Sequence, residues 1–302
     1  MRPSGACPDP ACQAPACAKA AEARILSIEE WRQALVEAAL ARKGDSPLVV
    51  TFSDHRYSPI LMNWLAALED IGISNVLVIS LDDVTHQLMR RAEVSSFRLP
   101  DEACDRDRFW VLRMRVFRDL CEGGVTFVHS DTDAIWLQNP FVTDLDLLGH
   151  DLIASQGTIW PLDVAGSQGF VLCCGFFMLR SSSASRALME AAMHIVEECE
   201  DDQIALNRAL VQKGIQWSTA LSTQYKMELN GHLFSCFESV IEGFASQIEL
   251  GVALLPQHRF QRIHSPLDSA VVCHPLTPKD AEEKRAVLNA LGCWFIDHPA
   301  RT

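Results

Sequence analysis

Short apolar runs alternate with amphipathic segments through the first half of the chain, and this alternation constrains the fold more than any other feature. Three runs have the length and β-branched content of buried strands: 48–53, 76–80 and 125–129. Segments with apolar residues at helical spacing separate or precede these runs: Pro59–Ile71, Val84–Ala92 and Asp105–Cys121. Strands that alternate with helices are typical of βαβ units, so we expect an α/β fold built on a parallel sheet.

The remainder of the chain is less regular. We expect a helix at Ser27–Arg42 with Ser27 as its N-cap, strands at Leu152–Ala154, Phe170–Leu179 and Val271–Cys273, and helices at Ser185–Glu198, Asp202–Val211 and Pro278–Leu291. A flexible leader rich in Cys, Pro and Ala is expected at residues 1–24, followed by a single domain at 25–302. Within that domain we expect a nucleotide-binding half at about 48–140 and an acceptor half at about 141–295. Variable acceptor loops are expected at 155–168 and 222–250.

The charge and hydropathy of the chain argue against two classes of protein. A net charge of −13, from 39 acidic and 26 basic residues, is unlike that of nucleic-acid-binding proteins, which cluster Lys and Arg against phosphate. A phosphorylated substrate is still compatible, because a metal ion can supply positive charge locally. No run approaches the roughly 20 apolar residues that span a bilayer. The N-terminal residues also lack the apolar core of a signal peptide, so the sequence as it stands predicts a soluble chain.

Eleven cysteines are many for 302 residues, but they do not define a redox compartment. Cys7, Cys12 and Cys17 lack the neighbouring second pair that a structural zinc site needs, so we expect disulfides within the leader or free thiols. Cys173 and Cys174 lie in an apolar run and are expected to be buried as small hydrophobic residues. An odd total leaves at least one thiol unpaired in a monomer.

An acidic pair after an apolar run, Asp131 and Asp133 in VTFVHSDTDAIWLQNPF (125–141), carries the strongest chemical signal. Ligands of open α/β sheets bind beyond the carboxyl ends of strands. Side chains two apart in an extended segment point the same way, so both carboxylates can face one cation, and such oxygen ligands suit Mg²⁺ or Mn²⁺. The bare pattern is also compatible with a turn. Two carboxylates between apolar runs are costly without a cation or hydrogen-bond donors, and this context favours a site.

This segment resembles the nucleotide-diphospho-sugar transferase family, which includes plant arabinosyl- and xylosyltransferases. Further segments resemble the family in the same order over about residues 48–295, and together they are far more specific than the acidic pair alone. They are the strand and Asn-Trp-Leu helix of Leu48–Asp82, the Gly-Phe segment Cys174–Arg180, the Asp-Gln box at 202–207, the His strand Val271–His274, and the Lys…Gly-x-Trp ending at 284–294.

The resemblance implies a GT-A-like α/β fold with a mixed, mostly parallel sheet flanked by helices. It also implies transfer of a sugar from a nucleoside-diphosphate donor, UDP-linked, to a glycan or glycoprotein acceptor. Retention at the anomeric carbon and a Mn²⁺ or Mg²⁺ cofactor belong to the same expectation. A family-typical protein would work in the Golgi lumen, although we expect no signal or membrane anchor within this sequence.

The resemblance also implies roles for particular residues. The metal ligands would be Asp131, Asp133 and His274, and the catalytic residues would be Asp202 and Gln203. The donor-binding residues would be Thr51, Phe52, Ser53, Arg113, Asp131, Gly175 and Lys284.

Each assignment has a plainer alternative. His274 is compatible with a buried histidine at a strand end, and Pro275 and Leu276 follow it where the family pattern predicts a polar neighbour. Asp202 is compatible with a helix N-cap and Lys284 with a solvated charged face.

The helix and the strands around the acidic pair contain four further residues whose roles can be predicted. Arg113 and Arg115 lie two apart on a predicted helix, point to different faces, and at most one of them should reach a diphosphate. His129 is expected to be a core or rim histidine, and Trp136 to serve packing.

Two other functions remain open on the sequence. A phosphohydrolase of the aspartyl-phosphate type also places Asp-x-Asp after an apolar strand, with the first Asp as nucleophile beside Mg²⁺. A domain that binds a nucleotide-sugar without turnover is the other alternative.

Overall fold

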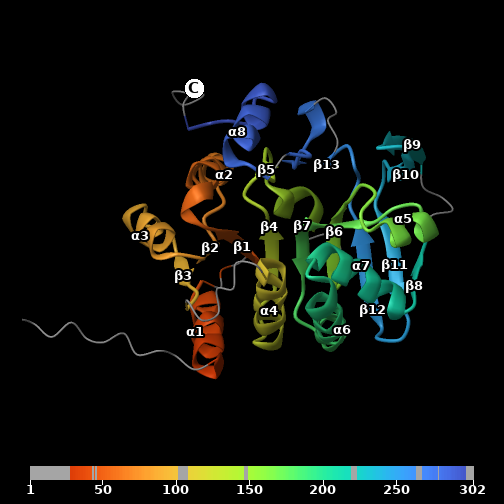
Figure 1. Cartoon of the computed structure of the whole chain (residues 1–302), viewed down its shortest axis with the longest axis horizontal. Helices are drawn as coiled ribbons and strands as arrows, with labels where there is room; N and C mark the ends of the chain where they lie inside the picture. The colour runs from red at the N-terminus through yellow and green to blue at the C-terminus, as the bar shows by residue number, and fades with distance from the viewer. Residues whose placement is uncertain are drawn as a thin grey trace, which may run out of the picture.

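A nine-stranded sheet forms the centre of the computed structural model of the chain (Figure 1), with the strand order β3-β2-β1-β4-β7-β6-β12-β11-β8. The structure describes residues 28–296, except 43, 45, 101–107, 146–148, 219–222, 263–266 and 278. The expected leader at 1–24 and the expected N-cap Ser27 lie outside the described residues.

Seven of these nine strands run in one direction, and only β7 and β11 oppose them. The strands are β1 (Leu48–Ser53), β2 (Val76–Ser80), β3 (Ser96–Arg98), β4 (Phe127–Ser130), β6 (Leu152–Gln156), β7 (Leu172–Leu179), β8 (Ile215–Trp217), β11 (Ile241–Ala245) and β12 (Leu250–Leu254). The expected fold class, an α/β GT-A-like fold with a mixed, mostly parallel sheet flanked by helices, is confirmed.

Helices cover both faces of the sheet and so bury its strands on both sides. Along β1, Val50 and Phe52 belong to one hydrophobic core, whereas Val49 belongs to the other. The first core includes residues of α1 (Ile28–Leu40), α4 (Phe109–Glu122), α6 (Ser183–Cys199) and α7 (Asp202–Gln212). The second includes residues of α2 (Ser58–Asp70), α3 (Asp83–Arg91) and α8 (Ala281–Ala290). Successive side chains along a strand therefore pack against helices on opposite faces, and the domain has three layers: helices, sheet and helices.

Two smaller sheets and a few short helices lie around this centre. The three-stranded sheet consists of β13 (Phe260–Gln261), β14 (Val272–Cys273) and β5 (Ile135–Trp136). The two-stranded sheet is a hairpin of β9 (Gln224–Leu229) and β10 (His232–Phe237). Short helical segments are η1 (His55–Tyr57), η4 (Phe141–Leu145), α5 (Leu162–Gln168) and η5 (Leu267–Ser269). In Figure 1, β5 and β13 lie near α8, and the β9–β10 hairpin lies at the opposite end of the sheet from α3.

The expected elements differ from the observed ones mostly at their ends. The strand expected at Val125–His129 begins at Phe127, because the Val125 N–H donates to Leu120 O in the turn that closes α4. That turn requires Gly124, whose φ of +81° lies in the left-handed region. The short edge strand β3 and the helix α5 were not predicted. Strand β3 has only three residues, all half-buried, and α5 has only seven, so neither shows a clear hydrophobic periodicity in the sequence.

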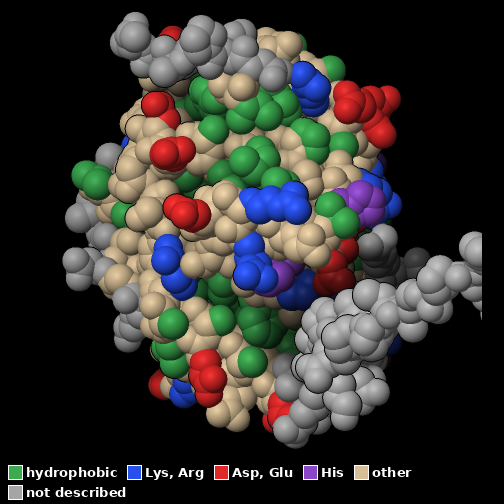
Figure 2. All heavy atoms as spheres, turned by 90° about the vertical axis from the view of Figure 1, so that its left-hand side faces the viewer, with side chains coloured by type: hydrophobic (Ala, Val, Ile, Leu, Met, Phe, Trp, Pro, Cys, Tyr) green, Lys and Arg blue, Asp and Glu red, His purple; other side chains and the backbone are tan. Residues whose placement is uncertain are grey.

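The edge of the molecule that carries α3 has a mixed surface. Figure 2 shows hydrophobic side chains interspersed with Lys, Arg and acidic groups on this side. None of the helices within the described ranges combines the length and apolar character needed to cross a bilayer.

Candidate functional site

The acidic pair lies in a turn at the carboxyl end of β4. Asp131 N donates to Gly175 O of the neighbouring β7 at 2.8 Å, and Ala134 N donates to Asp131 O at 3.0 Å. The two carboxylates can face one cation, as expected, but the segment that carries them is a turn and not the extended chain that the sequence suggested. The hydrogen bond between Ala134 N and Asp131 O closes this turn, and the turn brings the two carboxylates together at the edge of the sheet.

His274 reaches this pair through the small sheet. Strand β5 directly follows the acidic turn, and it pairs with β14 so that Cys273 lies opposite Ile135. This pairing sets His274, the next residue, beside the turn. Its Nε2 atom lies 3.3 Å from Asp133 Oδ1 and 3.7 Å from Asp131 Oδ2. One ligand atom from each of the three residues lies within 4.8 Å of the other two.

Gly175 makes room for this cluster. A Cβ atom added to Gly175 would lie 2.1 Å from His274 Cε1 and 2.5 Å from Asp131 Oδ2, so these two side chains would have to move away. Gly175 was expected to face the donor sugar, and the structure sets its backbone directly against two members of the acidic cluster. A glycine on β7 is therefore a steric condition for the approach of Asp131 and His274.

A divalent cation fits these three residues chemically. Burial opposes ionisation of Asp131, but the Arg113 guanidinium holds its pKa well below the usual range. Burial likewise opposes ionisation of Asp133, while His274 and Lys284 hold its pKa below the usual range. Two ionised oxygens and an imidazole nitrogen form the kind of donor set that Mn²⁺ or Mg²⁺ accepts.

Arg113 joins this cluster to the first turn of α7. Its Nη1 donates to Asp131 Oδ1 at 2.7 Å and its Nε to Asp202 Oδ2 at 2.6 Å, and the Arg113 side chain is buried. His129 lies under the same carboxylate, with Nε2 at 3.2 Å from Asp131 Oδ1 and Nδ1 at 3.1 Å from Val50 O. Burial lowers the pKa of His129 to about 4, so it is a neutral core histidine at neutral pH.

Asp202 is not the N-cap that the plainer alternative suggested. Asp201 caps α7, with Oδ1 accepting from Ile204 N at 2.8 Å, while Asp202 turns inward to Arg113. Burial raises the pKa of Asp202 to about 6, although Arg113 opposes this shift. Gln203 accepts from Cys174 N at 3.2 Å and so ties α7 to β7.

Lys284 extends from α8 to the other side of the pair. Its Nζ forms an ion pair with Asp133 Oδ2 and donates to Thr277 Oγ1 at 2.7 Å. Thr277 in turn donates to Asp133 Oδ2 at 3.0 Å. The charged face of α8 is therefore not uniformly solvated, since the Lys284 side chain is only 15% exposed.

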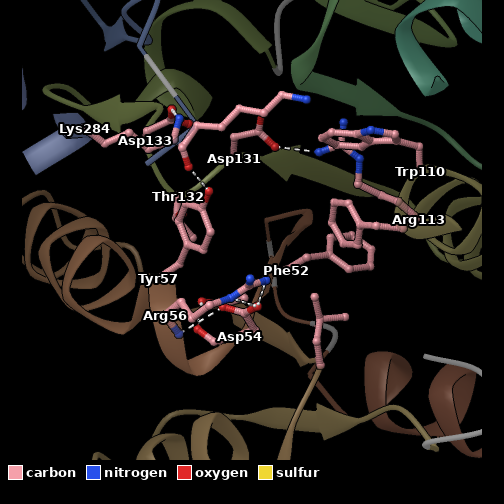
Figure 3. A pocket seen from close by; sticks show the side chains of 14 residues that line it. Phe52, Asp54, Arg56, Tyr57, Trp110, Arg113, Asp131, Thr132, Asp133 and Lys284 are labelled. Carbon is pink, nitrogen blue, oxygen red and sulfur yellow. Dashed lines mark hydrogen bonds and ion pairs between the residues drawn. The ribbon is translucent and has the colours of Figure 1, made fainter. Parts of the chain in front are cut away.

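A cavity of about 300 Å³ leads from the acidic pair towards the end of β1 (Figure 3). Aromatic residues form much of its wall, with Phe52 and Tyr57 on one side and Trp110 on another. Ser53 also lines it. Thr51 does not, because its side chain is buried within β1, and its hydroxyl has no hydrogen-bond partner among the described residues.

A second cavity, of about 270 Å³, opens from the same acidic pair on the side of α7. It shares five lining residues with the first: Trp110, Arg113, Asp131, Asp133 and Lys284. Gly175, Asp202, Gln203 and His274 line only this second cavity of the two. Two of the three candidate ligands, Asp131 and Asp133, thus lie where the two cavities meet, and His274 lies beside them in the second.

Several residues that line these cavities were not predicted, and four of them bear on the chemistry of the site. Trp110 lies at the junction, with the Arg113 guanidinium 4.5 Å from its ring centroid. Trp160, Arg262 and Thr277 line the second cavity. Single residues of these types carry no pattern in the sequence, and only the pairing of distant segments reveals them. Arg115, by contrast, lines neither cavity, as its spacing from Arg113 predicted.

A profile of the family described as nucleotide-diphospho-sugar transferase matches residues 71–279 of the chain. Arabinosyltransferases RRA2 and RRA1 of Arabidopsis thaliana are each 27% identical over 188 residues; the match covers 54% of this chain and 44% and 47% of those relatives, respectively. The UDP-galactose:fucoside alpha-3-galactosyltransferase of Dictyostelium discoideum is 25% identical over 100 residues, 33% of this chain and 15% of that protein. The chain therefore spans about half the length of the arabinosyltransferases that it matches.

Proposed function

Because this chain belongs to the nucleotide-diphospho-sugar transferase family, whose profile matches residues 71–279, we propose that it is a glycosyltransferase. It transfers a sugar from a nucleoside-diphosphate donor to a hydroxyl group of a glycan or glycoprotein. In this transfer the acceptor oxygen forms the new bond to the anomeric carbon, the bond to the diphosphate oxygen breaks, and the hydroxyl proton is released.

The observation that carries this proposal is that two cavities meet at Asp131 and Asp133, with His274 beside them in the second cavity. A transferase must hold the nucleotide and the acceptor close to the same reacting carbon, each in a site of its own. The aromatic first cavity, lined by Phe52 and Tyr57, suits a nucleoside, whereas the polar second cavity suits a sugar. The negative diphosphate would lie between them.

Mn²⁺ or Mg²⁺ held by Asp131, Asp133 and His274 would supply a Lewis acid for the charge that develops on the leaving diphosphate. The chain contributes further cations near this position. Lys284 and Arg262 both line the second cavity, and Arg262 forms no ion pair with a carboxylate of the described residues. Both side chains can therefore stabilise negative charge on the phosphates.

Asp202 serves the proposed reaction by positioning and charge rather than as a free nucleophile. Its side chain is only 5% exposed and is held by Arg113. A carboxylate fixed in this way can stabilise positive charge on a sugar at the mouth of the second cavity. Gln203, which lines the same cavity, would hydrogen-bond sugar hydroxyl groups.

A UDP-linked donor and retention at the anomeric carbon complete the proposal. The name of the Dictyostelium relative supports both, since that protein uses UDP-galactose, an α-linked donor, and forms an α linkage. The names of the arabinosyltransferase relatives support a pentose as the transferred sugar, and that of the Dictyostelium relative supports a hexose.

The test is a screen of UDP-linked sugars with Mn²⁺, with Mg²⁺ and with EDTA, scored by release of UDP in the presence and absence of glycoside acceptors. We expect release that requires the metal and is accelerated by an acceptor. Metal-dependent binding of UDP in calorimetry without any turnover would instead indicate a nucleotide-sugar-binding domain. Absence of both turnover and UDP binding would contradict the proposed function.

A further inference from the structure

Trp160 combines wide exposure with a fixed orientation. It lies between β6 and α5, its side chain is 46% exposed, and it lines the second cavity but not the first. A single exposed aromatic residue is common on a protein surface, but Trp160 lies at a cavity that the candidate site residues also line, where its ring can contact a ligand.

Two hydrogen bonds tie Trp160 to the start of α7. Its Nε1 donates to Asp201 Oδ2 at 3.3 Å, and its carbonyl oxygen accepts from Gln203 Nε2 at 2.6 Å. Both partners are themselves anchored, because Asp201 caps α7 through Oδ1 and Gln203 accepts from Cys174 N. The indole is thus held in place before any ligand arrives, which lowers the entropy cost of binding to it.

The surroundings of Trp160 match the chemistry of a sugar ring. A sugar presents C–H groups on its faces and hydroxyl groups at its edge. The face of an indole is apolar, with negative charge density that attracts C–H groups, and Leu276 adds a second apolar side chain, 42% exposed, on the same cavity. Asp201 and Gln203 supply oxygen and nitrogen atoms for hydroxyl groups beside the ring.

We propose that Trp160 is a stacking platform for a sugar ring of the acceptor glycan. This inference rests on the proposed function. The acceptor is the occupant, rather than the donor sugar, because Trp160 lies at the exposed rim of the second cavity, whereas Asp202, which is proposed to face the donor sugar, is only 5% exposed. The exposed rim of the second cavity is where a larger glycan can enter from solvent.

The test compares Trp160→Ala and Trp160→Phe with the wild-type protein. Phe244→Ala is the matched control, because Phe244 is also an exposed aromatic residue (51%) but lines neither cavity. Initial rates are measured with the best UDP-sugar and Mn²⁺ against a panel of methyl and p-nitrophenyl glycosides. Circular dichroism melting verifies that each variant is folded, and the conservative Trp160→Phe variant keeps a ring if the Ala variant does not fold.

We expect Trp160→Ala to raise the acceptor KM at least tenfold while the donor KM changes less than twofold. Trp160→Phe should show a smaller rise, and Phe244→Ala none. An unchanged acceptor KM in both Trp160 variants, or an equal rise in donor KM, would overturn the platform but leave the proposed function intact. A wild-type protein that releases no UDP from any donor would overturn both.

Discussion

Arg113 Nε donates a hydrogen bond of 2.6 Å to Asp202 Oδ2, and both side chains are about 5% exposed. The same guanidinium contacts Asp131, so one cation is shared by two carboxylates. Burial acts on both acids, yet the pKa of Asp131 falls well below its usual range whereas that of Asp202 rises to about 6. His129 and His274 assist Asp131 but not Asp202, which explains the asymmetry.

This sharing predicts that the two halves of the Arg113–Asp202 pair differ in their effect on stability. Arg113→Ala leaves the buried Asp202 carboxylate and the half-buried Asp131 carboxylate without their cation and should lower the free energy of unfolding by about 3–5 kcal/mol. Asp202→Asn leaves Arg113 paired with Asp131 and should cost only about 1 kcal/mol. Urea denaturation of both variants at pH 7 measures the difference.

The double variant Arg113→Ala with Asp202→Asn is the control for that experiment. It should be less destabilised than the sum of its single changes, because Asp202→Asn removes one of the carboxylates that Arg113→Ala leaves without a cation. Equal losses from Arg113→Ala and Asp202→Asn would show that the guanidinium is not shared in this way.

The raised pKa of Asp202 predicts a particular dependence of stability on pH. Because the folded protein binds the Asp202 proton more tightly than the unfolded chain does, this stabilisation is fully present below the ordinary carboxyl pKa of roughly 4. It is lost as the pH rises through about 6. The unfolding free energy of the wild type relative to Asp202→Asn should therefore fall by on the order of 2 kcal/mol between pH 4 and pH 7. A difference that rises with pH would contradict this.

Gly175→Ala should weaken metal binding strongly while the protein still folds. The new methyl group would displace His274 and Asp131, so we expect Mn²⁺ affinity to fall by on the order of 10²-fold and metal-dependent UDP release to fall with it. Electron paramagnetic resonance of free Mn²⁺ measures the affinity directly.

Gly251→Ala is the matched control for Gly175→Ala. Gly251 also lies in a strand of the central sheet, but its nearest contact for an added Cβ, at 3.5 Å, is ordinary. Unchanged Mn²⁺ affinity in Gly175→Ala would contradict the assignment of Asp131 and His274 as metal ligands.

Much of the sheet could be predicted from local pattern, because buried parallel strands require continuous apolar runs. The runs at 48–53 and 76–80 became strands with the expected bounds. The acidic pair could be located as well, since β4 ends directly before it. The backbone of the pair was expected to be extended, with side chains that alternate as along a strand. It is instead a turn, closed by the hydrogen bond from Ala134 N to Asp131 O.

The second cavity could not be predicted, because it depends on segments that meet only in the fold. Trp160 comes from the connection after β6, whereas Arg262 directly follows β13. Neither residue has a partner at a characteristic spacing. Even His274, for which the family resemblance supplied a role, owes its position to the pairing of β14 with β5 some 140 residues earlier in the chain.

Lys284 allows metal binding and nucleotide binding to be separated. Its ammonium group forms an ion pair with Asp133, so it both neutralises a candidate ligand and adds positive charge beside the site where the diphosphate is proposed to lie. Lys284→Ala should therefore bind Mn²⁺ alone at least as tightly as the wild type, because a competing cation has gone. In the presence of Mn²⁺ it should bind UDP about tenfold more weakly, a loss of about 1.4 kcal/mol.

Calorimetric titrations of Mn²⁺, and then of UDP at saturating Mn²⁺, measure these two effects separately. Lys213→Ala, which removes a lysine that lines neither cavity, is the control and should change neither affinity. If Lys284 only anchored α8, the variant would lose thermal stability with no change in the ratio of the two affinities. The expected separation, metal affinity kept and UDP affinity reduced, arises only if the ammonium group acts on the diphosphate.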